Sequence, residues 1–465
     1  MKILSLTVTG FLLVAGGCAS PMDWSGAGDE SLPNREPTRA SLEPATDPGS
    51  QQRSDIPIDL ASLGSLSLDD AIRIGIASSP VLKRAGYQVD IAAGQVIQAG
   101  LYPNPSLSFN GEGFGTSAGA GGETIYRVEQ EIVLGGKIER ARKVARADQR
   151  VARAAFVSEE FAVASRVSRA YYAAVAARER LQSRQNLLDL ATQLLEAAST
   201  QVDAGSATEP DRLRAQVVFE QAAIELDNAR LAEGASKRTL SRAMGLDQTV
   251  DLELSTEVDQ RPELGDLETT AAKVLDANSR LEVARLSVER ARRAHDLAKA
   301  RAIPNLTASI GPRYSDIDNE TTVDLGIGMQ IPLFDRNQGN IRSAIAQRLS
   351  ASAELKSVQL ELLEEVSQAW AVYEATRVAT QRYRERLLPK AELTLELTRQ
   401  AYERGKTDYL RLLDAQQVVI ESRIAYVDAL ERMQEAAALL RELAQTDAPW
   451  RSSQPGQAPA TEGTP

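Results

Sequence analysis

Residues 323–331 read Val323-Asp324-Leu325-Gly326-Ile327-Gly328-Met329-Gln330-Ile331, and every second side chain in this stretch is apolar. Successive side chains of a β-strand point to opposite faces, so the pattern predicts a strand with one apolar and one polar face. Further segments around Leu107, Tyr126 and Leu306 alternate in the same way. This alternation is typical of membrane β-barrels, and also of any half-buried sheet. Four strands cannot close a barrel, because the smallest single-chain barrels have about eight, so a membrane barrel would be shared between subunits.

The strands belong to an internal repeat. Landmarks recur in the same order along the chain: Pro103-Asn104 returns as Pro304-Asn305, Ile132-Val133-Leu134 as Ile331-Pro332-Leu333, Ser168-Arg169-Ala170-Tyr171 as Ser367-Gln368-Ala369-Trp370, and Leu213-Arg214-Ala215-Gln216 as Leu413-Asp414-Ala415-Gln416. A nearly constant offset across strands, turns and helices indicates duplication of one unit. The sequence therefore predicts repeat 1 over residues 66–260 and repeat 2 over residues 261–446.

Each repeat is predicted to follow one plan, rich in helix. The predicted order is a first helix (67–101; 267–302), two strands (about 105–134; about 305–333), a very long helix (137–204; 339–404), a glycine turn, and a final helix (210–244; 408–443). Gly205 and Gly405 form the turns, which make each long helix antiparallel to its successor. Pro389 is expected to kink the second long helix, because proline cannot donate a backbone hydrogen bond.

Seven-residue spacing marks the long helices as coiled-coil partners. The spaced side chains are Leu181, Leu188, Leu195 and Val202 in repeat 1, and Leu388, Leu395 and Tyr402 in repeat 2. Charged residues make up 25% of the chain and aromatic residues 5%, which is typical of long helices. The net charge of −11 disfavours nucleic acid as a partner, because phosphate binding needs a basic surface.

The N-terminus has the pattern of an export signal. Lys2 precedes an apolar run, and small residues lead to Cys18, the single cysteine of the chain. The pattern predicts a signal peptide over residues 1–17, lipidation of Cys18 with palmitate, and a lipid-anchored linker over residues 18–65. The alternative is a cysteine that lies by chance in a signal cut elsewhere. Residues 447–465 are rich in proline and are predicted to be a disordered tail.

Three short stretches carry a resemblance to a known family. They are Ala99-Gly100-Leu101-Tyr102-Pro103-Asn104-Pro105, Glu131-Ile132-Val133-Leu134-Gly135-Gly136-Lys137, and Pro332-Leu333-Phe334-Asp335-Arg336-Asn337-Gln338-Gly339. The chain resembles the TolC-like outer membrane factors over about residues 66–446, and among them the CzcC-type proteins of heavy-metal efflux.

The resemblance implies a homotrimer whose twelve-stranded β-barrel, in the outer membrane of a Gram-negative cell, continues into an α-helical barrel in the periplasm. It implies that the turns at Gly205 and Gly405 form periplasmic tips that contact an adaptor (a membrane fusion protein) coupled to an inner-membrane, proton-driven RND-type transporter. The expected function is a passive exit duct for divalent heavy-metal cations. Two alternatives stay open: a duct for drugs or type I secreted polypeptides, and a structural periplasmic coiled-coil lipoprotein.

The resemblance also assigns a periplasmic entrance. Asp414 matches a family aspartate that narrows the tunnel in a ring of carboxylates, and Arg411 and Asp408 lie near it. Where a relative carries a second aspartate, this sequence has Arg411, which argues against a doubled acidic ring. The alternative for Asp414 is an exposed helix carboxylate paired with a nearby arginine.

Nothing in the sequence selects an enzyme, a cofactor or a resident metal ion. His295 is the single histidine and has no cysteine partner, so a solvated helix surface is expected. Asp316, Asp318, Asn319 and Glu320 lack the glycine and the spacing of a calcium loop. The glycines between Gly111 and Gly122 lack a phosphate-binding spacing, and are expected to form a mobile outer loop.

Overall fold

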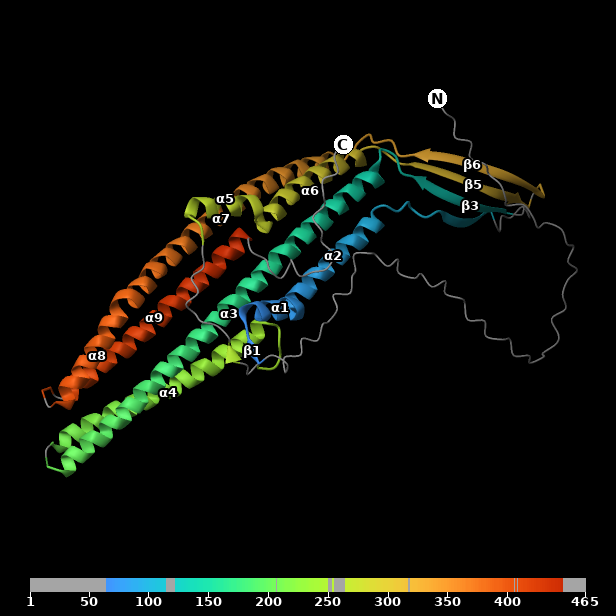
Figure 1. Ribbon diagram of the computed structural model, residues 1–465. Helices are drawn as coiled ribbons and strands as arrows, with labels where there is room; N and C mark the ends of the chain where they lie inside the picture. The colour runs from blue at the N-terminus through green and yellow to red at the C-terminus, as the bar shows by residue number, and fades with distance from the viewer. Residues whose placement is uncertain are drawn as a thin grey trace, which may run out of the picture. The chain divides into compact units, whose positions relative to one another are not determined.

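The computed structural model describes residues 64–113, 122–205, 207–249, 253–254, 264–316, 318–404, 406–407 and 409–445. Helices predominate in these residues, and the longer strands gather in one sheet (Figure 1). The predicted signal peptide, Cys18, most of the linker, the tail, Gly405 and Asp408 lie outside the described residues, as does most of the glycine-rich stretch.

Four helices lie side by side and lead directly into or out of the sheet (Figure 1). α2 (Pro80–Gln98) packs on α3 (Lys137–Asp203), α3 on α6 (Ser279–Arg301), and α6 on α7 (Gln338–Arg382). α2 and α6 precede a strand, whereas α3 and α7 follow one. We call this row of four helices the wall; α2 and α7 are its edges.

The first helix of each repeat is split in two, so the prediction of single helices over 67–101 and 267–302 is wrong. α1 (Leu68–Ser78) ends at Ser79 and α5 (Leu267–Ala277) ends at Asn278. Both residues have extended backbone and cap the following helix: the Ser79 hydroxyl accepts from the Leu82 N–H at 3.5 Å, and the Asn278 side chain accepts from the Arg280 N–H at 2.9 Å. Ser79 also precedes Pro80, which disfavours helical backbone.

The long helix of repeat 2 is interrupted before Pro389, as the sequence predicts. α7 passes through a π-helical turn (Tyr383–Leu387) into α8 (Leu388–Glu403). Pro389 has no N–H to donate, so the regular α-helical hydrogen bonding is interrupted here, and the π-helical turn lies directly before it. α3, which has no proline, runs unbroken for 67 residues. α4 (Glu209–Ala243) returns along α3, and α9 (Tyr409–Ala444) returns along α8 and α7 and also packs on α3.

The core forms where the two repeats meet on α3, α7 and α9. Tyr171 is fully buried there, and its hydroxyl donates to the Leu66 carbonyl at 2.9 Å. Further along α3, the predicted seam residues Leu188 and Leu195 are only half buried, whereas Ala191 is fully buried. Leu194, one residue before the predicted position Leu195, is also buried, so the buried positions here are not the predicted seven-residue positions. A short parallel pair, β1 (Ser65–Leu66) with β4 (Glu253–Leu254), was not predicted.

The sheet contains four antiparallel strands in the order β2 (Ser106–Glu112), β3 (Glu123–Ile132), β5 (Leu306–Ser315) and β6 (Glu320–Met329). The pairing of β3 with β5 joins repeat 1 to repeat 2. In the described part of the chain, β2 and β6 each have an edge without a partner strand. No helix among the described residues has the length and apolar character needed to cross a membrane.

Candidate functional site

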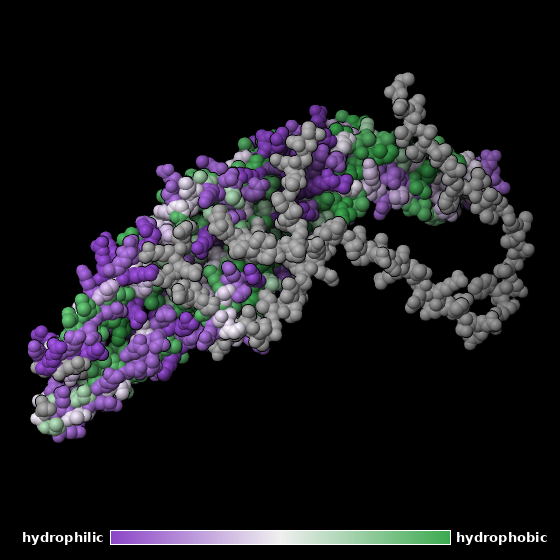
Figure 2. Space-filling model, viewed as in Figure 1, coloured by the Kyte–Doolittle hydropathy of each residue, from purple (hydrophilic) through white to green (hydrophobic). Residues whose placement is uncertain are grey.

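The sheet has one apolar face, as the alternating pattern predicts. Directly paired residues share a face, and the register pairs Phe109 with Tyr126, and Val128 with Ile310, which in turn pairs with Leu325. Leu107 and Leu325 are each 77% exposed and Ile327 is 80% exposed. Figure 2 shows hydrophobic residues over the sheet and its junction with the helices, while hydrophilic residues predominate on the helices. Such an exposed apolar face needs a partner other than water.

The opposite face is polar and is held together by Arg313 of β5. The Arg313 guanidinium donates to Asp324 of β6 at 2.7 and 3.0 Å, and to Glu123 of β3 at 2.7 Å. One cation thus joins three strands through charge-assisted hydrogen bonds. Ile125 is the exception on this face, since it is apolar and buried.

Gly311 and Pro312 mark a close approach between β5 and β3. A Cβ added at Gly311 would lie 1.7 Å from the Tyr126 carbonyl oxygen, so only glycine fits at this position. Pro312 lacks an N–H, and the pairing of β3 with β5 skips both residues.

The family motif at residues 332–339 forms the turn from β6 into α7. Asn337 has left-handed backbone with φ of 60°, its N–H donates to the Asp335 carboxylate at 2.8 Å, and its side chain donates to the Ala298 carbonyl of α6 at 2.6 Å. In repeat 1, Gly135 and Gly136 take the equivalent place with φ of 72° and 63°. The motif therefore fixes the strand-to-helix junction, and its Phe334 side chain is 91% exposed.

The turn of repeat 1 lies at the far end of α3 from the sheet. Gly205 has φ of 71° and open space around its Cα, and it ends α3. A capping box begins α4: the Thr208 N–H and hydroxyl both donate to the Asp211 carboxylate, at 3.0 and 2.6 Å. These hydrogen bonds lower the pKa of Asp211. The matching Gly405 turn lies outside the described residues.

Two of the three predicted entrance residues share one side of α9. Arg411 and Asp414 are both exposed and lie three residues apart, which places them on neighbouring turns of the helix. Asp408 lies outside the described residues. The structure therefore brings Arg411 and Asp414 together, and it does not describe the third residue.

His295 is buried, so the expectation of a solvated helix surface is wrong. Only 8% of the residue is exposed, because α6 packs between α3 and α7. Its Nδ1 lies 3.9 Å from the Asp296 carboxylate. Among the described residues, no three His, Cys, Asp or Glu side chains are placed to hold a metal ion. Between β5 and β6, the Asn319 side chain accepts from the Tyr314 hydroxyl at 2.9 Å, and Ser315 donates to Asp318 at 3.2 Å, as in an ordinary turn.

An ion cluster between α3 and α9 was missed by the sequence analysis. Arg180 donates to Asp428 at 2.6 Å and also to Glu431. Glu435 lies at the same pocket, where burial and then the charge of Glu431 raise its pKa above its ordinary value. No local signal in the sequence pairs side chains so far apart along the chain.

Comparison with known proteins identifies relatives of this architecture. A family model described as "Outer membrane efflux protein" matches residues 72–246 and 271–444. The cobalt-zinc-cadmium resistance protein CzcC of Cupriavidus metallidurans is 26% identical over 80% of this chain and 88% of its own length. The nickel-cobalt-cadmium resistance protein NccC of Alcaligenes xylosoxydans xylosoxydans is also 26% identical, over 65% and 70%. The CmeC outer membrane channel of Campylobacter jejuni shares the fold, with a TM-score of 0.70, 14% identity, and coverage of 83% of this chain and 88% of that one.

Proposed function

Since the chain belongs to the outer membrane efflux protein family, we propose that it forms the outer-membrane exit duct of a tripartite efflux system, as a homotrimer. Members of this family are channels, and the chain is accordingly an efflux duct of the outer membrane of Gram-negative bacteria and not an enzyme. The proposed cargo is a divalent heavy-metal cation, because the relatives CzcC and NccC are named for resistance to such metals. Passage of the cargo needs no resident metal site, because tight binding would slow its release.

The proposal of a trimer is supported by the sheet, which has one exposed apolar face and two edges without a partner strand among the described residues. Open edges are not tolerated in lipid, because unpaired backbone groups cannot be hydrated there. Pairing β6 of one subunit with β2 of the next around a threefold axis gives a closed barrel of twelve strands. Its apolar face meets lipid, and its polar face, with the Arg313 cluster, lines a water-filled bore.

Exposed apolar stripes on the helices support the same assembly. Both edges of the wall carry them: Tyr87 and Ile91 on α2 are 65% and 51% exposed, and Leu349 on α7 is 61% exposed. The returning helix α4 carries such a stripe as well, where Ile224 and Leu231 are 60% and 71% exposed. In the trimer these stripes pack against neighbouring subunits, and the wall continues the barrel as a tube of helices.

The remaining assignments complete the proposal. Cys18 carries the lipid anchor after removal of residues 1–17, the linker spans residues 18–65, and residues 447–465 form a tail beyond the repeats at 66–260 and 261–446. The tips at Gly205 and Gly405 contact the periplasmic adaptor, which couples the duct to a proton-driven RND-type transporter. Asp414, with Arg411 and Asp408 beside it, narrows the periplasmic entrance.

The test is assembly and conductance of the purified protein. In mild detergent the full chain should have the mass of a trimer, and in planar bilayers it should form discrete, stable pores. A monomer that forms no pores would refute the proposal and favour a structural coiled-coil lipoprotein.

The cargo is tested separately, in the strain of origin. Deletion of the gene should lower tolerance to Zn²⁺, Co²⁺ and Cd²⁺, and leave tolerance to antibiotics and secretion of large polypeptides unchanged. The opposite pattern would assign the duct to drugs or secreted polypeptides instead.

A further inference from the structure

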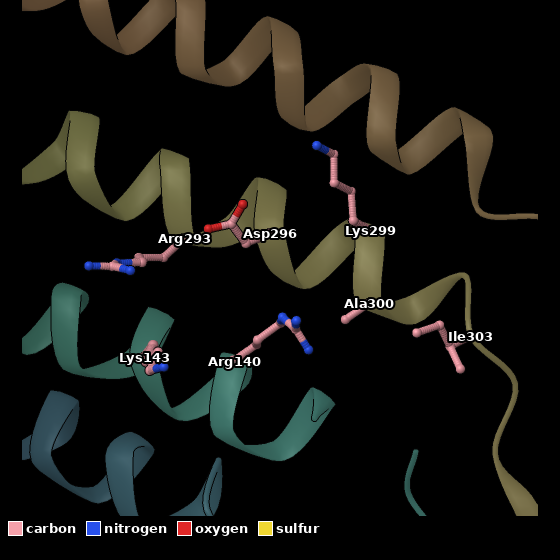
Figure 3. Close-up of a pocket in the computed structure, with 7 residues that line it drawn as sticks. All are labelled: Arg140, Lys143, Arg293, Asp296, Lys299, Ala300 and Ile303. Atoms are coloured by element: carbon pink, nitrogen blue, oxygen red, sulfur yellow. The ribbon is translucent and has the colours of Figure 1, made fainter. Parts of the chain in front are cut away.

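A cationic pocket lies where the start of α3 meets the end of α6 (Figure 3). Its volume is about 320 Å³. The charged lining residues are Arg140, Lys143, Arg293, Asp296 and Lys299, so four cations share the pocket with one carboxylate. The proposed transport of cations gives this pocket no role.

Two of the four cations of the pocket have carboxylate partners outside it, and both contacts are long; for Lys143 the distance to Glu139 is 3.8 Å. The Arg140 guanidinium donates to the Gly135 carbonyl, which is uncharged. Arg293 lies 3.4 Å from Glu289, but Glu289 makes a shorter contact of 2.7 Å with Arg150. An anion with several acceptor oxygens would therefore gain charge-assisted hydrogen bonds in the pocket.

The pocket adjoins an exposed apolar band. Ile303 lines the pocket and is 45% exposed, and its side chain packs over Gly135, where an added Cβ would come within 2.8 Å of Ile303 Cδ1. At the same junction Leu333 and Phe334 are 64% and 91% exposed. Apolar side chains bordered by Lys and Arg are typical of the level at which lipid tails give way to headgroups.

Lys299, at the α6 rim of the pocket, lies away from the polar side of the wall, whereas Arg140 of α3 is three residues from Lys137, on that polar side. There Lys137 donates to Asn305 at 2.5 Å, and Asn305 donates to Glu131 of the polar face. Burial lowers the pKa of Lys137; the charge of Glu131 opposes this shift, and the charge of Arg301, which lies close to this group, adds to it. Lys299 and Ile303 are each two residues from Arg301; for Lys299 on α6 this is about 200° around the helix, so it projects away from the polar side.

Neighbouring copies of the chain do not cover this pocket when they pack edge to edge. α3 and α6 are the inner helices of the wall, flanked by α2 and α7. We propose that the pocket binds the phosphate of an anionic phospholipid headgroup, with the acyl chains on the band around Ile303, Leu333 and Phe334. This inference rests on the proposed placement of the sheet in the outer membrane.

The experiment measures lipid retained by the purified full-length trimer. The trimer is released in the mass spectrometer from micelles that contain phosphatidylglycerol or phosphatidylcholine. Native mass spectrometry then measures how much of each lipid stays bound to it. The wild type should retain phosphatidylglycerol preferentially. Lys299→Gln, and the double variant Arg140→Gln/Lys299→Gln, should reduce that retention, the double variant by about tenfold. The matched control, Arg214→Gln/Arg230→Gln on exposed turns of α4, should retain as much as the wild type.

Three results would overturn the inference: equal retention of the two lipids, unchanged retention in the variants, or binding of inorganic phosphate by calorimetry without retention of lipid. Lys299 is an exposed side chain, so its single variant decides the matter if the double variant does not assemble. Pores formed in phosphatidylcholine bilayers separate the two proposals. Normal conductance without lipid selectivity rejects only the headgroup site, whereas the absence of trimer and pores rejects the duct as well.

Discussion

At the scale of single residues, the sheet depends on the missing side chain of Gly311. Gly311→Ala would place a Cβ against the Tyr126 carbonyl of β3, on the backbone itself, where no side chain can move aside. We expect the strands to be forced apart at a cost of about 1–3 kcal/mol, and the trimer to dissociate at a lower temperature on electrophoresis. Gly328→Ala is the control, because a Cβ there meets nothing within 4 Å. Equal dissociation temperatures for both variants would contradict this account.

Asp414 gives the second prediction at this scale. Three copies of an exposed carboxylate on a narrow axis repel one another and attract cations, so Asp414→Ala should change single-channel conductance and weaken block by multivalent cations. Planar-bilayer recording measures both quantities.

Controls distinguish the possible roles of Asp414. Glu196→Ala removes an exposed carboxylate from α3 and should change neither quantity. A larger conductance in both Asp414→Ala and Arg411→Ala would indicate that these residues form an ion pair between subunits that holds the entrance closed. Weaker block by multivalent cations in Asp414→Ala alone would indicate a ring of carboxylates that selects cations. If Asp414→Ala behaves as the wild type, Asp414 is an ordinary surface carboxylate.

At the scale of elements, the packing of α9 on α3 carries a pH dependence. Burial, and then the charge of Glu431, raise the pKa of Glu435 above its ordinary value of 4.5, and Arg169, Arg432 and Arg180 only oppose this shift. An acid with a raised folded pKa favours folding while it is protonated, so its contribution is lost as the pH rises from 4.5 through the raised pKa.

Glu435→Gln should therefore raise the melting temperature at neutral pH. The gain should vanish at about pH 4, where the glutamate of the wild type is mostly protonated and is as neutral as the glutamine of the variant. Thermal unfolding followed by circular dichroism at the two pH values measures this. Glu220→Gln, on an exposed turn of α4, is the control and should change the melting temperature at neither pH. A gain that is the same at both pH values would rule out the electrostatic cause.

The elements also show what the sequence predicts and what it does not. The strands and long helices were predictable because their periodicities are local. The interruption of the second long helix was predictable because Pro389 lies next to it. The break at Asn278 was missed because the helical pattern continues across it, whereas the break at Ser79 had a local signal in Pro80 that the prediction of a single helix did not use. Arg180 and Asp428 lie 248 residues apart, so their ion pair follows from the packing of α3 on α9 and from no local pattern. Burial of His295 likewise depends on both neighbours of α6.

At the scale of the whole molecule, the proposed duct has two independent attachments to the membrane. Cys18→Ser should abolish incorporation of labelled palmitate and block processing by the lipoprotein signal peptidase, because the Cys18 thiol is the proposed site of lipidation. The barrel should still hold the variant in the membrane, so membrane fractionation is a poor readout and labelling is the measurement. Unchanged labelling and processing would exclude the lipoprotein assignment.

The order of the four strands has a consequence for the symmetry of the assembly. Within a chain, β3 at the end of one hairpin pairs with β5 at the start of the other. In the proposed trimer, β6 and β2 make the equivalent junction between chains. The ring is thus a pseudo-sixfold array of single hairpin units, in which each chain is a covalent dimer of halves. Among the described residues, all four strands of the sheet come from the two hairpins and none from the connection between the halves. Two separately expressed fragments, each with one hairpin and its helices, should therefore assemble together into a conducting pore.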